Sequence, residues 1–214
     1  MEPFIRSDQF QFIKYQLQQL INGHTTVNDT KVLNALKSLV QDKVHDLFPN
    51  LTEEQAYILS PISEIQDATN AEAYLLLLKP HVIPFRSITE GVIKKLFAKA
   101  KKLRVPQLEH IDFQELTYLG WLDSGSNKKY IVTEYEDKLI GIQGSVANTS
   151  KKGICMICNR HEQVSMFLSE VKGSRSADGT FIKRGNYICQ DSETCNRNLM
   201  SRDKLDEFIK ILSK

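Results

Sequence analysis

The stretch Gly153-Ile154-Cys155-Met156-Ile157-Cys158-Asn159 decides the fold of the C-terminal part of this sequence, together with two later cysteines. Two residues separate Cys155 from Cys158, and a turn of that length lets both thiolates reach one cation at about 2.3 Å. Tyr187–Cys189 is typical of a strand end, and Cys195 lies where a helix can begin, so that helical N–H groups help to hold its thiolate. The spacing predicts a single structural zinc ion on Cys155, Cys158, Cys189 and Cys195.

Two other interpretations of the cysteines are reduced thiols without a role and a disulfide pair. No secretion signal is visible, because charged residues such as Glu2 and Arg6 interrupt the first apolar stretch. The longest apolar run, at 73–78, is far shorter than the roughly 20 residues of a membrane span. We therefore expect a cytoplasmic protein without a membrane contact, in which clustered cysteines bind metal.

The order of elements around the cysteines indicates the type of finger. A cysteine turn is followed by strands, a cysteine at a strand end, a cysteine at a helix start and a closing helix, which is the order of a treble-clef zinc finger over about 153–214. A flexible loop is predicted at 173–179. The closing helix has four apolar residues at helical spacing, which we expect to be mainly core, namely Leu205, Phe208, Ile209 and Leu212.

Helical spacing dominates the first hundred residues and predicts a bundle over 1–106. Ser7 is the expected cap of the first helix and Gly23 its end, and Ser87 with Glu90 forms a capping box for a later helix that Pro106 closes. Shorter helices are expected at 52–60 and 69–79. The first two apolar stripes consist of Phe10, Ile13, Leu17, Leu20 and Ile21, and of Val32, Leu36, Leu39, Val40 and Leu47.

From residue 107 the pattern changes to aromatic and β-branched residues. Strands are predicted at 113–122, 129–136 and 138–146, with a turn at 123–127 and a polar connector at 147–153. The predicted fold class is α+β, with an N-terminal helical bundle followed by a small β/α lobe over 107–214 that ends in the zinc finger.

The composition is that of an ordinary globular protein, with 41% hydrophobic and 25% charged residues in 214. The formal net charge of +2 is too small for a general nucleic-acid or membrane binder. Basic residues are nevertheless concentrated at 151–184, a segment that contains seven basic and three acidic residues. The seven are Lys151, Lys152, Arg160, Lys172, Arg175, Lys183 and Arg184. Such a patch can steer the chain toward an acidic partner.

The zinc is expected to be structural, because four thiolates leave no open position for water. His161 is the one histidine near the finger, and the sequence contains no nucleophile–histidine constellation, P-loop or GxGxxG motif. We therefore expect a binding protein and not an enzyme. Met156, Arg184 and Tyr187 are difficult to bury together in a small finger, and such residues are typical of interface hot spots.

With its helical bundle, short β segment and four-cysteine finger, the whole chain resembles the FusB-type fusidic-acid-resistance proteins, also called elongation-factor-G-binding proteins. The resemblance extends from Met1-Glu2-Pro3-Phe4 to the finger segment 153–159. It implies a protein, which we expect to be a monomer, that binds the C-terminal domains of elongation factor G, free or on the ribosome. It further implies that the zinc lobe makes the main contact, that factor trapped by fusidic acid is released, and that resistance follows.

Carried over from the family, the contact positions fall on Met156, Arg184, Tyr187 and Phe208. An aromatic residue is usual in the family where Met156 stands, and lysine where Arg184 stands. Arginine and lysine are not interchangeable at a shaped site, so affinity or preference among elongation factors can differ from the family pattern.

Two alternatives remain from other classes of protein. An RNA-binding zinc finger acting at the ribosome would use the basic residues of 151–184 and lose affinity steeply with salt, although the modest net charge makes direct nucleic-acid binding unfavoured. A nuclease built on a treble clef would need a metal-binding or basic histidine on the finger, and His161 alone is a weak candidate.

Overall fold

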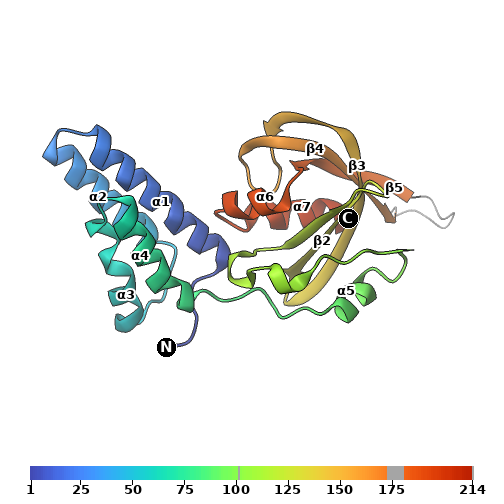
Figure 1. The fold of residues 1–214 in the computed structure, drawn as a ribbon, viewed down its shortest axis with the longest axis horizontal. Coiled ribbons are helices and arrows are strands. Elements are labelled where there is room, and N and C mark those ends of the chain that lie inside the picture. The colour runs from blue at the N-terminus through green and yellow to red at the C-terminus, as the bar shows by residue number, and fades with distance from the viewer. Residues whose placement is uncertain (101, 173–180, 214) are drawn as a thin grey trace. The chain divides into compact units, whose positions relative to one another are not determined.

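The computed structural model describes residues 1–100, 102–172 and 181–213 (Figure 1). The chain divides into two compact units, Met1–Ile83 and Pro84–Lys214. The first unit is helical, and the second is built on an antiparallel sheet, as the predicted α+β class requires. Within the described ranges, no helix is long and apolar enough to cross a membrane.

Four helices form the first unit: α1 (Ser7–Thr26), α2 (Thr30–His45), α3 (Glu53–Leu59) and α4 (Ala68–Leu78). Short 3₁₀ turns at Ser60–Glu64 and Lys79–His81 follow α3 and α4. The helices are held together by a core drawn from residues 5–82 alone, whose fully buried side chains include Ile5, Phe10, Ile13, Leu17, Leu20, Ile62 and Leu78. This unit therefore has a hydrophobic core of its own.

The helix ends follow side-chain chemistry, with two departures from the sequence prediction. Asp29, Thr52 and Asp67 cap α2, α3 and α4 as acceptors for backbone N–H groups. Ser7 is not the cap of α1 but its first residue, and Gly23 does not end that helix. A Cβ at Gly23 would overlap the Leu36 side chain, so this glycine allows α1 and α2 to approach closely.

The first unit ends before the boundary predicted at 106. Helix α5 (Glu90–Leu96) belongs to the second unit, where Ile93 and Phe97 pack in a cluster with Leu119, Tyr130 and Val132 of the sheet. Its cap is Thr89, whose Oγ1 accepts from Val92 N at 3.3 Å, and not the predicted Ser87. The backbone leaves the helix at Phe97, well before Pro106. Two 3₁₀ turns, Leu108–His110 and Phe113–Glu115, lead into the sheet.

Among the residues that the structure describes, five antiparallel strands follow in sequential order: β1 (Leu119–Asp123), β2 (Lys128–Tyr135), β3 (Lys138–Ile154), β4 (His161–Lys172) and β5 (Phe181–Cys189). The sheet is followed by α6 (Ser192–Asn198) and α7 (Asp203–Ser213), which Figure 1 shows beside it. The predicted core role of the closing helix is confirmed, because the four residues predicted for the core, Leu205, Phe208, Ile209 and Leu212, are all buried. The loop predicted at 173–179 lies outside the described residues.

Strand β3 corrects the prediction of a polar connector at 147–153. The strand continues to Ile154 and pairs with β4 through Ser150↔Ser165 to Ile154↔His161, after a register shift between Val146 and Ser150. Most side chains of this stretch are exposed, so the strand lacks the alternation of polar and apolar residues that sequence reasoning uses. Pairing with a neighbouring strand, and not burial, maintains it.

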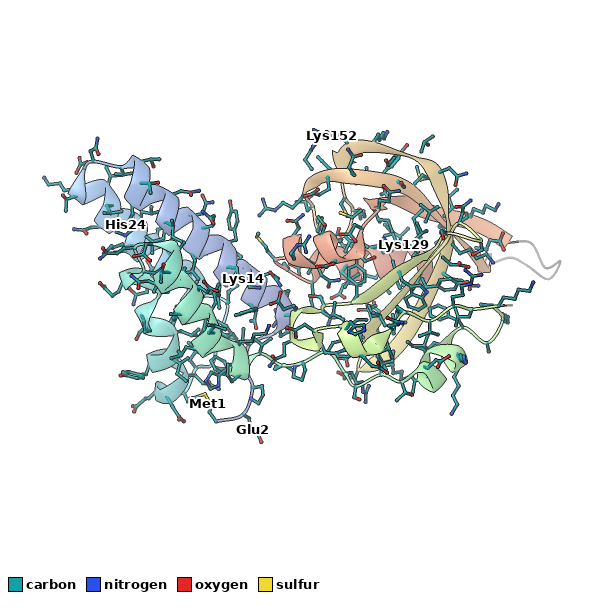
Figure 2. The ribbon with its side chains drawn as sticks, viewed as in Figure 1. Met1, Glu2, Lys14, His24, Lys129 and Lys152 are labelled. Atoms are coloured by element: carbon teal, nitrogen blue, oxygen red, sulfur yellow. The ribbon has the colours of Figure 1, made fainter. Side chains whose placement is uncertain are left out.

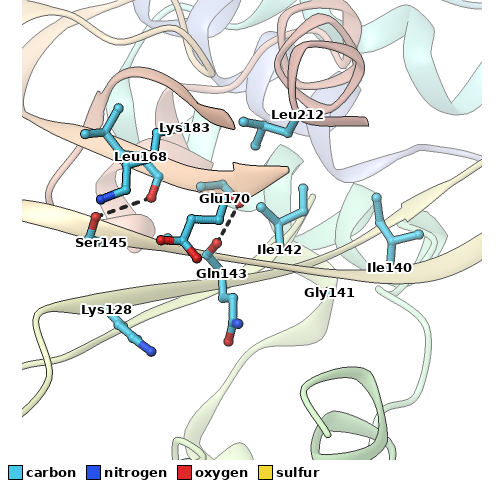
Figure 3. A pocket seen from close by; sticks show the side chains of 12 residues that line it. Lys128, Ile140, Gly141, Ile142, Gln143, Ser145, Leu168, Glu170, Lys183 and Leu212 are labelled. Atoms are coloured by element: carbon cyan, nitrogen blue, oxygen red, sulfur yellow. Dashed lines mark hydrogen bonds between the residues drawn. The ribbon is translucent and has the colours of Figure 1, made fainter. Parts of the chain in front are cut away.

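The sheet opens at one end because β3 and β4 separate. Their pairing begins at Ser145↔Leu168, so the earlier part of β3 pairs with β2 alone. Ser169 Oγ donates to the Gln143 carbonyl at 2.8 Å across the gap, and Ser145 Oγ donates to the Leu168 carbonyl at 3.4 Å (Figure 3). The opening has a volume of ≈ 440 Å³ and is lined by residues of both strands and by Leu212 of α7.

Candidate metal centre

The four cysteines meet at one point in the second unit, and all four are buried. Cys155 and Cys158 lie on the turn between β3 and β4, Cys189 is the last residue of β5, and Cys195 lies in α6. All four Sγ atoms lie within 4.8 Å of one another, with Cys155 and Cys195 3.8 Å apart and Cys158 and Cys189 3.6 Å apart. Sulfurs bonded to zinc at about 2.3 Å in a tetrahedron lie about 3.8 Å apart, so the geometry fits zinc.

The cysteine turn is shaped by backbone hydrogen bonds. Cys155 N donates to the Arg160 carbonyl and Asn159 N donates to the Cys155 carbonyl, both at 2.9 Å. Asn159 has a φ of 55°, a left-handed conformation that asparagine tolerates better than most residues. Ile157 N and Cys189 N each lie 3.3 Å from Cys155 Sγ and donate to it. These N–H groups favour the thiolate form of Cys155.

The thiols influence one another strongly because they lie so close together. Hydrogen bonding from Cys158, and then from Cys189 and Cys195, holds the pKa of Cys155 well below the usual range of a thiol. The hydrogen bond with Cys155 in turn raises the pKa of both Cys189 and Cys195. The four sulfurs therefore compete for negative charge, and a bound divalent cation removes the competition by stabilising all four thiolates.

Two polar residues that the sequence analysis did not single out support the centre. Lys129 in β2 is 1% exposed, and its Nζ donates to the carbonyls of Cys189 and Gln190 at 2.8 Å each (Figure 2). Burial lowers the pKa of Lys129, while the negative charges of Cys195 and Cys189 act in the opposite direction. A buried cation here offsets the negative charge of a zinc ion bound by four thiolates.

Asn196 is the second supporting residue, and it follows the ligand Cys195 directly. Its Oδ1 accepts from Thr117 N at 2.8 Å and Tyr118 N at 3.2 Å, and its Nδ2 donates to the carbonyls of Tyr118 and Ser192 at 2.9 Å each. These bonds fasten α6 to the start of β1. A sequence signal for Asn196 was its place beside a cysteine on a helix, whereas Lys129 carries no local signal.

The residues predicted to contact a partner do not all lie on one surface. Met156 N donates to the Tyr187 carbonyl at 2.9 Å, so these two half-buried residues are neighbours beside the zinc turn. Arg184 lies on the opposite face of β5 from Tyr187, because the two are three positions apart in a strand. Phe208 is 0% exposed and packs against Phe167, with ring centroids 5.7 Å apart.

Several basic residues of the predicted patch are engaged in local contacts. Lys151 Nζ lies 4.0 Å from the centre of the Tyr187 ring, Arg160 Nη2 donates to Met200 Sδ at 2.9 Å, and Arg184 Nη1 donates to the Ile211 carbonyl at 3.3 Å. Lys152 projects from β3 into solvent (Figure 2). Arg175 lies outside the described residues.

His161 is exposed at the start of β4. In the part of the chain that the structure describes, the four cysteines are the one group of three or more histidine, cysteine or acidic residues placed to share a metal ion. The geometry is thus that of a closed structural site.

Comparison with known proteins identifies the family. Residues 4–86 match the family model described as elongation factor G-binding protein, N-terminal, and residues 88–209 match that of the FBP C-terminal treble-clef zinc-finger. A solved structure described as that of the fusidic acid resistance protein FusC is 34% identical in sequence with a TM-score of 0.84, and the match covers 98% of this chain and 97% of that one. Among curated protein sequences no match was found. The chain belongs to the elongation factor G-binding protein family, whose C-terminal part is a treble-clef zinc finger.

Proposed function

We propose that this protein binds elongation factor G through its zinc-finger lobe and promotes release of the factor from ribosomes stalled by fusidic acid. Resistance to fusidic acid follows from that release. The observation that carries the proposal is the full-length similarity to FusC, a fusidic acid resistance protein, with 34% identity over 98% of this chain. The two family models support it, because residues 4–86 match the N-terminal part of elongation factor G-binding proteins and residues 88–209 match the FBP C-terminal treble-clef zinc-finger.

The proposed mechanism makes and breaks no covalent bond. Binding releases the factor if the protein prefers a conformation of the factor that holds the ribosome less well. A protein that bound the trapped and released states equally would shift nothing. We propose that it acts in the cytoplasm as a monomer, on the C-terminal domains of the factor, whether free or ribosome-bound.

The contact surface that we propose is centred on Met156 and Tyr187. These residues lie side by side next to the zinc turn, and the cation of Lys151 holds the Tyr187 ring from one side. Arg184 extends the contact on the other face of β5. Phe208 acts indirectly, because its buried ring supports Phe167 in the core of the sheet.

A release assay tests the function. Elongation factor G labelled with a fluorophore is trapped on ribosomes with fusidic acid, and its dissociation rate is followed after the zinc-loaded protein is added. We expect faster dissociation at saturating protein. Tyr187→Ala should raise the Kd for the free factor at least about 30-fold, as removal of a hot-spot aromatic does. Tyr57→Ala is the matched control, because Tyr57 is an exposed tyrosine of the helical unit.

Unchanged dissociation at saturating protein would contradict the proposal. Binding to naked ribosomal RNA that falls steeply with salt, with no complex with the factor, would instead favour the RNA-binding alternative. If Tyr187→Ala and Tyr57→Ala lost binding equally, the contact would not be confined to the zinc-finger lobe.

A further inference from the structure

The segment 91–108 of the second unit is strongly basic. It contains six lysine or arginine residues and no acidic residue, namely Lys94, Lys95, Lys99, Lys101, Lys102 and Arg104. The formal net charge of the whole chain is only +2, so the rest of the sequence conceals this concentration. Like charges this close together repel one another, and runs of them commonly bind a nucleic acid or another polyanion. Lys101 lies outside the described residues.

The basic segment is anchored to the sheet and is not a loose tail. Its apolar residues are buried or half-buried in the cluster that joins α5 to the sheet, namely Ile93, Phe97, Ala100, Leu103 and Val105. Gly141 of β3 allows the close approach, because a Cβ there would lie 2.9 Å from Phe97 Cε1. Trp121 Nε1 donates to the Arg104 carbonyl at 2.9 Å. The basic residues are therefore held on a packed surface of the second unit.

The basic side chains of this segment face solvent. The exposed ones among the described residues are Lys94, Lys95, Lys99, Lys102 and Arg104. Lys94 forms an ion pair with Glu90 at 2.6 Å, and Arg104 interacts electrostatically with Asp123. The three remaining lysines form no ion pair among the described residues. Their positive charges are thus available to a partner.

The surface formed by Lys95, Lys99 and Lys102, which we call the lysine surface, offers charge without an apolar anchor. None of the large hydrophobic side chains that are exposed in the described structure lies between residues 84 and 121. Protein–protein interfaces are depleted in lysine and depend on apolar or aromatic anchors. Phosphates of a nucleic acid, in contrast, are bound by cations alone. The chemistry of the lysine surface therefore fits a phosphate backbone better than an acidic protein.

The lysine surface is distant from the contact proposed at the zinc turn. The segment packs on β3 at Gly141, whereas Tyr187 lies beneath Lys151, ten residues further along the same strand. At about 3.3 Å per residue, about 30 Å of strand separates the two positions. One partner can therefore occupy the lysine surface while another contacts Tyr187.

We propose that the lysine surface binds the phosphate backbone of RNA. Each lysine neutralises a phosphate and releases counterions, so binding is independent of the base sequence. The choice of RNA over other polyanions rests on the proposed function, because a ribosome presents RNA next to the trapped factor. A weak contact of this kind raises the effective concentration of the protein at its site of action.

The test is fluorescence anisotropy of a fluorescein-labelled single-stranded oligouridylate with the full-length, zinc-loaded protein between about 50 and 200 mM salt. The combined variant Lys95→Gln, Lys99→Gln and Lys102→Gln should bind more weakly. Its plot of log affinity against log salt should be less steep by about 2, because each lost phosphate contact removes about 0.7 from the slope. The control combines Lys31→Gln, Lys43→Gln and Lys210→Gln, which removes the same charge from exposed positions elsewhere and should leave the slope unchanged.

Equal slopes in the two triple variants, or no binding of the oligouridylate at the lowest salt, would overturn the proposal. Tighter binding to polyglutamate would indicate an acidic protein partner, and tighter binding to phosphatidylserine vesicles a membrane surface, and either result would also overturn it. The lysine variant should still co-elute with elongation factor G, and loss of that complex would assign the lysine surface to the factor instead. If the unaltered protein binds the oligouridylate but not the factor, the proposed function fails while the RNA contact is supported.

Discussion

At the scale of single residues, Cys155 is the zinc ligand whose sulfur accepts backbone hydrogen bonds from two other parts of the metal centre. Its Sγ lies 3.8 Å from that of Cys195 and accepts N–H groups from Ile157 and Cys189. A serine at this position offers a shorter side chain and a poor zinc ligand. Structural zinc sites of this kind contribute on the order of 10 kcal/mol to folding, which is comparable with the stability of a whole domain.

We therefore expect Cys155→Ser to lose its zinc and to unfold the finger. Metal content is measured by mass spectrometry of the intact protein and packing by near-ultraviolet circular dichroism. Met156→Leu, a conservative change at the next residue, should retain both zinc and fold. A folded Cys155→Ser protein with one zinc ion per chain would contradict this account of the site.

Lys129 allows a second test at the same scale. Lys129→Met removes the buried cation and both hydrogen bonds to the carbonyls of Cys189 and Gln190. Partners of this kind next to the ligands typically change metal affinity 10- to 100-fold, so we expect zinc to bind at least about 10-fold more weakly. Lys128→Met changes the exposed neighbour in the same strand and should have no effect. Competition with a chromogenic chelator measures both, and equal affinities in the two variants would refute the role.

The sequence predicted the ligands but not their supporting residues, for a physical reason. Cys155 and Cys158 are close in the chain, so their spacing alone restricts geometry. Lys129 reaches the site from a distant strand, and nothing near it in the sequence distinguishes it from the exposed Lys128. The same holds for Phe208, whose burial against Phe167 depends on how α7 lies on the sheet.

At the scale of elements, the β4–β5 ladder depends on a glycine. A Cβ at Gly185 would overlap the backbone carbonyl of Phe167 in β4. Because this is a backbone atom, the overlap can be relieved only if one of the two strands moves. We expect Gly185→Ala to destabilise the second unit toward the upper end of the about 1–3 kcal/mol typical of overpacking. Gly125→Ala is the control, because the nearest atom to a Cβ there is Asp123 Oδ1 at 3.5 Å. Urea denaturation compares them, and equal stabilities would contradict the close approach.

Elements also show where sequence patterns fail. The capping box predicted at Ser87 and Glu90 was wrong, because Thr89 caps α5 through its hydroxyl and Glu90 is the first residue of the helix. Boundaries of this kind depend on which apolar residues become buried, and Ile93 and Phe97 are held by the sheet. The last part of β3 was missed because an exposed strand lacks an apolar face.

At the scale of the whole molecule, the hydrophobic clusters, and not the helical or strand content of a segment, determine which unit each element belongs to. The cluster of the helical unit includes residues from Phe4 to Val82, whereas α5 contributes to a cluster that extends to the sheet. The sequence could not place α5, because helical periodicity identifies an apolar face but not its partner. The zinc centre adds its cysteines to a third cluster, which contains Phe208 and the other buried residues of α7.

This separation of cores leads to a prediction about the intact protein. Because the helical core contains no residue of the metal centre, removal of zinc should unfold the finger while the helices of the first unit remain folded. Under the proposed function, the same treatment abolishes the complex with elongation factor G. Circular dichroism at 222 nm after chelation should retain a cooperative thermal transition, and size-exclusion chromatography should show no co-elution with the factor. Re-addition of zinc should restore the co-elution.

If the chelated protein still forms the complex, the binding surface lies on the helical unit. If the helices lose their cooperative transition on chelation, the two cores are not independent.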